Sequence, residues 1–471
     1  MQMKKLKKGD VIDIVIEKLT FEGGGLGNFE GLKVFVEGAM PNDRVLAYVF
    51  KVKKNYAEAR LLEIVEQSKD RIEARCEYDE VCRGCQIQFM PYEKQVEYKI
   101  SHIEDCLSKI GGINDVRISE MIKAKEQFYY RNKMEFSFGY DAEKNFSLGM
   151  HAPNRRFDIL DLKHCYLQSP FSVAILALTR KFAKEKGFIP FNFANGEGDF
   201  RAIYIREGKR TGEVMVNIVS SDNVSKKTVS DIEELANLLS GLRPSIKEEE
   251  NKKIVSIYWT KVISKRGVPR INKEYLLYGK NYISEKMIIL DQSLEFDIYP
   301  QSFFQVNTFQ AEELYKIVRE MATEKSHNIV FDLFCGTGTI GLFLAKSVEQ
   351  VIGIELAQDA VKSARENALK NKIFNIDFYQ GDVFKKISEI KERPSLIIVD
   401  PPRAGLTEKS ILKINEFSPS QIIYVSCNPA TLARDLKMFK EFSYKIKEVK
   451  AVDMFPNTYH IETVVFLEKE N

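Results

Sequence analysis

The sequence lacks the features of a membrane protein or an exported protein. None of its apolar stretches reaches the length of about 20 residues that a transmembrane helix needs. The basic start MQMKKLKKGD continues as VIDIVIEKL, which alternates apolar and polar residues where an export signal would have an apolar run. With 44% hydrophobic and 29% charged residues, the composition is that of an ordinary globular protein, which we expect in the cytoplasm.

An excess of charge of one sign is also missing, because the net charge of the 471 residues is only +3. The protein therefore has no global basic field of the kind that attracts nucleic acid, and such binding would need local patches. A short basic run can equally be a solvated face. Two runs are candidates: the lysines at positions 4, 5, 7 and 8 with those at 51, 53 and 54, and the run YYRNK at 129–133.

The seven cysteines do not indicate a disulfide framework, because their number is odd and no export signal precedes them. Three of them fall within ten residues as Cys76-x5-Cys82-x2-Cys85, and Cys165 follows 80 residues later. Four thiolates can hold a tetrahedral zinc ion or an iron–sulfur cluster. The spacing alone leaves zinc, a cluster and a site without metal open.

Hydrophobic patterns divide the chain into three predicted domains. Residues 1–66 contain short alternating strands such as VIDIVIEKL and RVLAYVFKV, which favour a small β-barrel of the OB type. Residues 67–290 mix strands and helices and contain the four clustered cysteines, which predicts an α+β domain. In residues 291–471 the apolar strands NIVFDLF, VIGIEL, SLIIVD and QIIYVS alternate with helical patterns. This alternation predicts an α/β domain with a doubly wound parallel sheet.

A glycine-rich loop follows the first of these strands, in the run CGTGTIG at 335–341. Glycines let the backbone approach a ligand closely, and the next helix adds its N-terminal dipole. The following strand ends at Glu355, whose carboxylate can accept hydrogen bonds from ribose hydroxyls. This pattern predicts a nucleoside cofactor, and both NAD enzymes and methyltransferases share it. Asp382 ends a further strand and is a weaker candidate for a contact near an adenine.

The strand SLIIVD ends in Asp400-Pro401-Pro402-Arg403, at the carboxyl edge where ligands bind in such sheets. A surface turn would explain these residues as well. An acidic residue before two prolines at this place resembles methyltransferases that modify nucleobases, and not dehydrogenases.

Cys427 directly follows the strand QIIYVS and is expected at the same edge. An average cysteine is a buried small hydrophobe, but a strand end before Asn428-Pro429 is an unusual place for one. Methylation of uracil at C5 needs a thiolate that adds to C6 and a base that later removes the C5 proton. Glu462 and His460 are candidate bases, although Glu462 can also be a solvated charge at a strand edge.

Four segments, in this order, resemble the RNA 5-methyluridine methyltransferases, the group that contains TrmA and RumA. The segments are QSFFQVN (301–307), DPPRAG (400–405), SCNPATLARD (426–435) and FPNTYHIE (455–462). The resemblance implies that Cys427 is the nucleophile and Glu462 the base. It also implies that four residues contact S-adenosylmethionine: Gln305, Phe334, Glu355 and Asp400. The family often has tyrosine where Phe334 stands, so stacking on the cofactor survives and a hydroxyl contact does not.

The resemblance extends to the rest of the chain. Residues 1–66 look like the TRAM barrel of RNA-modifying proteins, which implies an RNA substrate whose target base is flipped out or unpaired. The four clustered cysteines match the branch of the family that carries a [4Fe-4S] cluster and acts on 23S ribosomal RNA. We therefore expect uridine C5 methylation of 23S ribosomal RNA, with the transfer RNA T-loop as the alternative substrate. No membrane and no obligate protein partner is indicated.

Three other interpretations fit the sequence less well. A cytosine-5 RNA methyltransferase would have a Pro-Cys or Thr-Cys nucleophile motif, whereas this chain has Ser426-Cys427. A radical enzyme with a TRAM barrel would need a C-x3-C-x2-C triad, and the first spacing here is x5. A non-catalytic RNA-binding iron–sulfur protein would have no reason to keep Cys427, Asp400 and Glu462 together.

Overall fold

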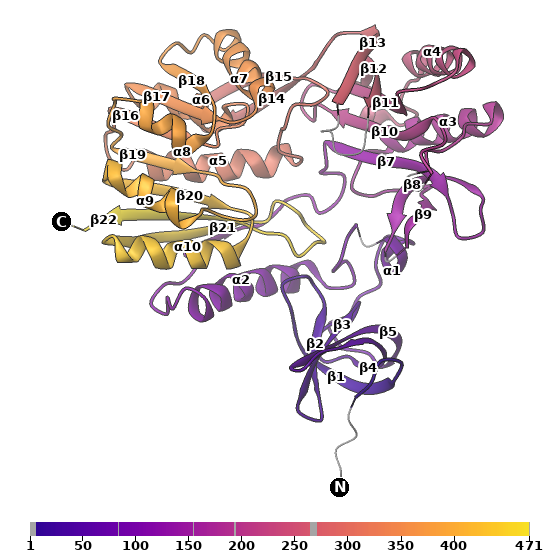
Figure 1. The fold of residues 1–471 in the computed structure, drawn as a ribbon, viewed down its shortest axis with the longest axis horizontal. Helices are drawn as coiled ribbons and strands as arrows, with labels where there is room; N and C mark the ends of the chain where they lie inside the picture. The colour runs from indigo at the N-terminus through magenta and orange to yellow at the C-terminus, as the bar shows by residue number, and fades with distance from the viewer. Residues whose placement is uncertain (1–5, 83, 154, 193–194, 264–270, 471) are drawn as a thin grey trace.

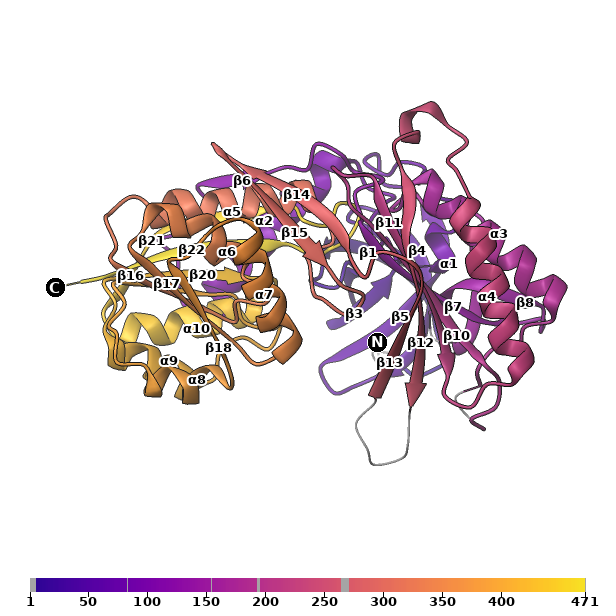
Figure 2. The same ribbon diagram turned by 90° about the horizontal axis from the view of Figure 1, so that it is seen from above.

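The computed structural model describes residues 6–82, 84–153, 155–192, 195–263 and 271–470. The chain forms a barrel near the N-terminus, a central sheet and a C-terminal sheet, which are separate from one another (Figure 1). The C-terminal sheet with its helices lies beside the central sheet in both views (Figures 1 and 2). Within the described ranges, no helix has the length and apolar character needed to cross a membrane.

The N-terminal strands close into a barrel in the order β1-β2-β3-β5-β4. Alternation explains the barrel, because every second side chain of β1, such as Ile12 and Ile14, is buried in the interior. Gly27 is required where β2 crosses β1, since a Cβ there would lie 2.5 Å from the carbonyl oxygen of Val15. The expectation of a small barrel is confirmed. Its strands are β1 (Val11–Leu19), β2 (Gly25–Phe29), β3 (Leu32–Glu37), β4 (Arg44–Val52) and β5 (Tyr56–Glu66).

The central sheet has the strand order β13-β12-β11-β10-β7-β8-β9 in the part of the chain that the structure describes. Helices α3 (Pro170–Lys186) and α4 (Lys226–Gly241) contact the sheet and each other, and their apolar side chains share one core with it. The short helix α1 (Asp79–Cys82) contacts β8. The strands are β7 (Lys133–Tyr140), β8 (Phe146–Ala152), β9 (Arg155–Asp161), β10 (Phe200–Glu207), β11 (Glu213–Ser221), β12 (Lys253–Ile263) and β13 (Ile271–Gly279).

The C-terminal sheet has the order β18-β17-β16-β19-β20-β22-β21-β6 among the described residues. Five neighbouring strands run parallel, as the strand–helix alternation predicts, and the Rossmann-like fold is confirmed. The strands are β16 (Ile329–Leu333), β17 (Gln350–Glu355), β18 (Ile376–Gln380), β19 (Leu396–Val399), β20 (Gln421–Ser426), β21 (Tyr444–Val452) and β22 (Glu462–Lys469). The helices are α5 (Thr308–Ala322), α6 (Thr339–Leu344), α7 (Gln358–Lys370), α8 (Val383–Lys386), α9 (Glu408–Phe417) and α10 (Pro429–Glu441).

Two elements from early in the chain also belong to this C-terminal layer. Strand β6 (Glu120–Ile122) pairs with β21, and helix α2 (Tyr92–Lys109) packs against α10. Ile103 and Leu107 of α2 share a core with Leu432 and Leu436 of α10. Figure 1 shows α2 between the barrel and the C-terminal sheet. The hairpin β14 (Ile283–Ile289) and β15 (Gln292–Ile298) joins the central part to α5, against which β14 packs.

Candidate active site

The register of two strands brings Cys427 and Glu462 to the same place. Strand β20 pairs antiparallel with β22, and Ser426 lies opposite Thr463. Continuing this register by one residue puts Cys427, the residue after β20, beside Glu462, the first residue of β22. The strand ends therefore bring together a thiol and a carboxyl group that are far apart in the sequence.

Asp400 reaches this edge from the neighbouring strand. Strand β19 runs parallel to β20, with Val399 next to Tyr424, so the residue after β19 also lies at the carboxyl edge. The backbone N–H of Asp400 donates to the carbonyl of Leu333 at 3.3 Å, which ties it to the end of β16. The structure thus places Asp400 with Cys427 and Glu462, as the sequence analysis expects of three residues that follow or begin strands.

The surroundings of Cys427 keep its sulfur protonated. Burial, and then the nearby carboxyl groups of Glu462 and Asp400, raise the pKa of the Cys427 thiol to about 11. The guanidinium of Arg403 acts in the opposite direction and lowers this pKa. The chemistry expected of Cys427 needs a thiolate. Substrates that bring positive charge or hydrogen-bond donors must therefore shift the equilibrium from the thiol to the thiolate.

The two carboxyl groups also hold protons more tightly than usual. Burial raises the pKa of Asp400 to about 7. Burial and the neighbouring Asp400 raise the pKa of Glu462 well above its usual range, since only 6% of this residue is exposed. Burial, followed by Arg403, lowers the pKa of His460 to about 4, so its imidazole is neutral. Carboxyl groups with raised pKa values in a site are typical of proton transfer near neutral pH.

The glycine-rich loop forms a backbone cradle at the ends of β16 and β17. The N–H of Gly336 donates to Oε2 of Glu355 at 3.1 Å, and the N–H of Ala357 donates to Oε1 at 2.8 Å. Gly338 has a φ of +79°, and a Cβ there would lie 2.5 Å from the ring of Phe378. Only glycine fits this position, because the left-handed backbone and the nearby Phe378 ring leave no room for a side chain.

Phe334 and Gln305 are two further residues expected to contact the cofactor. Phe334 directly follows β16 and has a φ of +63°, an uncommon conformation for a bulky residue, and its ring packs edge-on against that of Phe384. Burial, followed by the carboxyl groups of Asp400, Asp332 and Glu462, raises the pKa of Tyr315, to which the side chain of Gln305 is hydrogen-bonded. Gln305 is therefore next to the carboxyl groups of the site. Asp382 instead caps α8, where its Oδ1 accepts from the N–H of Lys385 at 3.0 Å.

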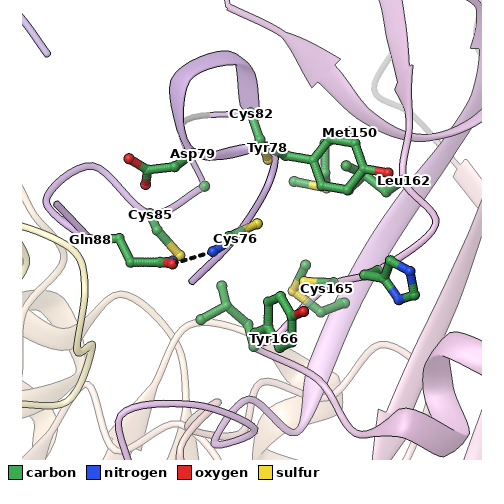
Figure 3. A pocket seen from close by; sticks show the side chains of 14 residues that line it. Cys76, Tyr78, Asp79, Cys82, Cys85, Gln88, Met150, Leu162, Cys165 and Tyr166 are labelled. Carbon is green, nitrogen blue, oxygen red and sulfur yellow. Dashed lines mark hydrogen bonds between the residues drawn. The ribbon is translucent and has the colours of Figure 1, made fainter. Parts of the chain in front are cut away.

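The four clustered cysteines line one cavity beside the central sheet (Figure 3). The volume of this cavity is about 40 Å³. Burial raises the pKa of all four thiols, and neighbouring thiols raise the pKa of Cys82 and Cys85 further. Among the residues that the structure describes, no group of histidine, cysteine and acidic side chains is suited to hold a single metal ion.

The two basic runs have different outcomes. Lys4 and Lys5 lie outside the described residues. In the run 129–133, Tyr130 and Asn132 are buried and serve the fold: the Tyr130 hydroxyl donates to the carbonyl of Pro456 at 3.1 Å, and the Asn132 side chain donates to that of Gln305 at 2.8 Å. Tyr129 is 36% exposed and has a φ of +55°. The run therefore alternates between inside and outside and is not a continuous patch.

Sequence reasoning missed the residues that hold the segment before Glu462. Lys99 forms a buried ion pair with Asp453, and the side chain of Gln95 forms two hydrogen bonds with Asn457. A lysine without any exposed surface is rare, but no local pattern in α2 marks Lys99 as buried. Its partner is 354 residues away in the sequence, so only the tertiary structure reveals the pair.

Comparison with known proteins identifies the family of the chain. Residues 247–470 match the family model for tRNA (Uracil-5-)-methyltransferase, and residues 5–62 match the TRAM domain. An uncharacterized RNA methyltransferase of Caldanaerobacter subterraneus is 38% identical over 98% of this chain and 100% of the relative. Another from Halalkalibacterium halodurans is 34% identical over 100% of this chain and 99% of the relative.

A solved structure covers almost the same length. It is the Pyrococcus abyssi tRNA (uracil-54, C5)-methyltransferase in complex with S-adenosyl-L-homocysteine. It is 29% identical, has a TM-score of 0.73, and covers 97% of this chain and 100% of its own. The cofactor product in that structure agrees with the cradle formed by the glycine-rich loop and Glu355. The chain therefore belongs to the TrmA/RumA-type family of S-adenosylmethionine-dependent RNA uracil-5-methyltransferases with a TRAM domain.

Proposed function

We propose that this protein methylates C5 of a uridine in 23S ribosomal RNA, in the cytoplasm, with Cys427 as nucleophile and Glu462 as base. The observation that carries this proposal is the register of β20 and β22, which sets the thiol beside a buried carboxyl group. A nucleophile and a base at one strand edge are what the two halves of the reaction need.

The reaction follows from these two groups. The Cys427 thiol loses its proton to solvent, the thiolate forms a bond to C6 of uracil, and the electron pair of the C5–C6 double bond becomes available at C5. S-adenosylmethionine would supply an electrophilic methyl group: C5 forms a bond to that methyl as the bond between the methyl and the sulfonium sulfur breaks, and S-adenosylhomocysteine leaves. Glu462 then takes the proton from C5, the C5–C6 double bond returns, and the sulfur leaves C6. The raised pKa of Glu462 makes its carboxylate a stronger base than that of an ordinary glutamate.

The cofactor contacts fit the cradle described above. Glu355 would bind the ribose hydroxyls, and Phe334 would stack on the cofactor, since both lie at the strand ends next to the glycine-rich loop. Gln305 and Asp400 would face the reacting end, because Gln305 is bonded to Tyr315 and Tyr315 interacts with Asp400. Asp400 would also touch the uracil, since its carboxyl group is near enough to Cys427 to raise the thiol pKa.

The four cysteines of the central part would hold a [4Fe-4S] cluster. They line one cavity and are the type of ligand that such clusters take. The cluster would have a structural role, because the proposed reaction contains no redox step. This proposal also keeps the domain division at 66/67 and 290/291, with the cysteines in the middle domain. The residues concerned are Cys76, Cys82, Cys85 and Cys165.

Two RNAs are candidate substrates. The barrel and the four-cysteine cavity favour 23S ribosomal RNA, because together they resemble the branch of the family that acts on it. The Pyrococcus abyssi structure favours the transfer RNA T-loop, because that protein acts on uracil 54 of tRNA. Mapping 5-methyluridine in both RNAs after deletion of the gene separates the two. Loss of the mark from tRNA alone would overturn the ribosomal assignment.

The catalytic roles are tested by three variants. Cys427→Ala should abolish methylation and leave binding of S-adenosylhomocysteine intact. Cys106→Ala, which removes a buried cysteine of α2 outside the site, is the matched control and should remain active. Glu462→Gln should accumulate a covalent RNA adduct, since the C5 proton stays in place. Substantial methylation by Cys427→Ala, or normal turnover by Glu462→Gln, would contradict the assignment.

A further inference from the structure

The residues before the base are held both by bonds among themselves and by contacts from elsewhere in the chain. Residues 453–461 link the end of β21 to Glu462, the first residue of β22, which pairs with Val452. Thr458 donates to the carbonyl of Phe455, and Asn457, in the middle of this connection, has a φ of +66°. The contacts from outside this connection come largely from helix α2. We call residues 453–461 the base loop.

A buried ion pair holds the start of the base loop. Nζ of Lys99 lies 2.6 Å from Oδ1 of Asp453, and neither side chain has any exposed surface. The same ammonium group donates to the carbonyl of Phe455 at 3.1 Å. Since an unpaired buried charge is strongly unfavourable, neither partner can move away from the other without a large cost. Lys99 therefore pins the loop at two residues.

A reciprocal amide pair holds the middle of the base loop. The N–H of Asn457 donates to Oε1 of Gln95 at 2.8 Å, and Nε2 of Gln95 donates to Oδ1 of Asn457 at 3.1 Å. Oδ1 and Oε1 are thus both satisfied in a buried place, where an unsatisfied amide would be costly. Two further bonds reach the same residue, because Asn457 Nδ2 donates to the carbonyl of Gln127 and the Ile87 N–H donates to the carbonyl of Asn457.

One rigid element carries both Gln95 and Lys99. They are four residues apart in α2, so they lie on the same face of the helix, one turn apart. The helix also packs against α10, which begins two residues after Cys427. Helix α2 thus contacts the element that follows the nucleophile and the loop that precedes the base.

We propose that Gln95 and Lys99 are positioning residues of the reaction: through Asn457 and Asp453 they hold the base loop so that Glu462 reaches the C5 proton. The inference rests on the proposed roles of Cys427 and Glu462. A displaced Glu462 leaves the addition of the thiol and the methyl transfer unaffected, because neither step uses the base. It slows only proton removal, so the protein stays bound to its methylated RNA through Cys427.

Single-turnover reactions with uridine-containing RNA test this inference. Gln95→Ala should raise the fraction of RNA trapped as covalent adduct about ten-fold and slow the release of methylated RNA by a similar factor. Its affinity for S-adenosylhomocysteine and its rate of adduct formation should stay within about two-fold of the parent protein. Lys94→Ala is the matched control, because this neighbour on α2 is exposed and pairs with Glu97 on the surface of the same helix.

A second variant avoids an orphaned charge. The double variant Lys99→Met with Asp453→Asn removes both charges together. It therefore destabilises the fold less than Lys99→Ala, which leaves Asp453 as an unpaired buried charge. It should accumulate adduct as Gln95→Ala does. Adding Glu462→Gln to Gln95→Ala should add little, since both changes act on the same step.

The outcomes separate the inference from the proposed function. If Gln95→Ala releases product like Lys94→Ala while Glu462→Gln traps adduct, the positioning role is wrong and the base assignment stands. If Gln95→Ala loses S-adenosylhomocysteine binding in parallel with activity, its role is general folding and the inference is overturned. If Glu462→Gln does not trap adduct, the proposed function itself fails.

Discussion

Alkylation of Cys427 in the free protein should require strongly alkaline pH. The cause is the site itself, where burial and the carboxyl groups of Glu462 and Asp400 raise the thiol pKa from 9.0 to about 11. At pH 8 a thiol with this pKa is ionised in about one molecule in a thousand, against about one in ten at the ordinary value. Because the thiolate is the reactive form, iodoacetamide should modify Cys427 about 100-fold more slowly than an unperturbed cysteine.

The measurement is the rate of alkylation between pH 7 and 10.5, followed on the peptide that contains Cys427 by mass spectrometry, without RNA or cofactor. The rate should rise about ten-fold for each pH unit over the whole range up to about pH 10. Asp400→Asn should accelerate it only above about pH 7, where the parent Asp400 becomes ionised and repels the thiolate. Arg403→Gln should slow it, because the guanidinium favours the thiolate. A plateau near pH 9 in the parent protein would refute the electrostatic reasoning.

Further predictions concern stability, the cofactor, RNA and metal. Burial raises the pKa of Asp400 from 3.8 to about 7, so ionisation of this carboxyl group destabilises the folded protein as pH rises from about 4 to about 7. Above about pH 7 the loss of stability is complete. The variant Asp400→Asn should therefore be more stable in urea by up to about 4 kcal/mol at pH 8 and no more stable at pH 4. Gly338→Ala should weaken binding of S-adenosylhomocysteine at least about ten-fold in calorimetry, because its Cβ would meet the Phe378 ring; unchanged affinity would contradict the cradle. Tyr129→Ala should weaken RNA binding about ten-fold in a filter assay if its exposed ring stacks on a base, whereas Tyr129→Phe should not. Anaerobically purified protein should contain iron and sulfide and Cys165→Ser should lose both; a colourless parent protein with stoichiometric zinc would refute the cluster.

The features that sequence reasoning predicted are those encoded by local periodicity. Alternating residues in β1 and β4 predict the barrel, and apolar strands that alternate with helices predict the Rossmann-like sheet. Because residues that follow parallel strands meet at one edge of the sheet, the proximity of Cys427 and Asp400 could also be predicted from the sequence. Glu462 joins them from an antiparallel strand, and there the family motif was the better guide.

The features that could not be predicted from the sequence depend on contacts between distant parts of the chain. The run at 129–133 is basic and aromatic, yet Tyr130 and Asn132 point inward because the base loop and Gln305 supply hydrogen-bond partners there. Strand β6 is only three residues long and exists because β21 offers it an edge. The pair of Lys99 and Asp453 has no signature in either neighbourhood. Such interactions carry no local pattern, since the partner and not the sequence around the residue decides its burial.

The nucleophile and the base are positioned by different parts of the chain. Cys427 directly follows β20, so the Rossmann-like sheet itself places the nucleophile. The base loop differs, because Gln95, Lys99 and Ile87 all precede the region 247–470 that matches the methyltransferase family model. The loop at Thr20 of the barrel in turn accepts a hydrogen bond from Tyr98 of α2. The helix that holds the base loop is therefore also the one that the barrel contacts. A methyltransferase sheet without these preceding residues would keep its thiol and its cofactor cradle but would lack the contacts that orient the base.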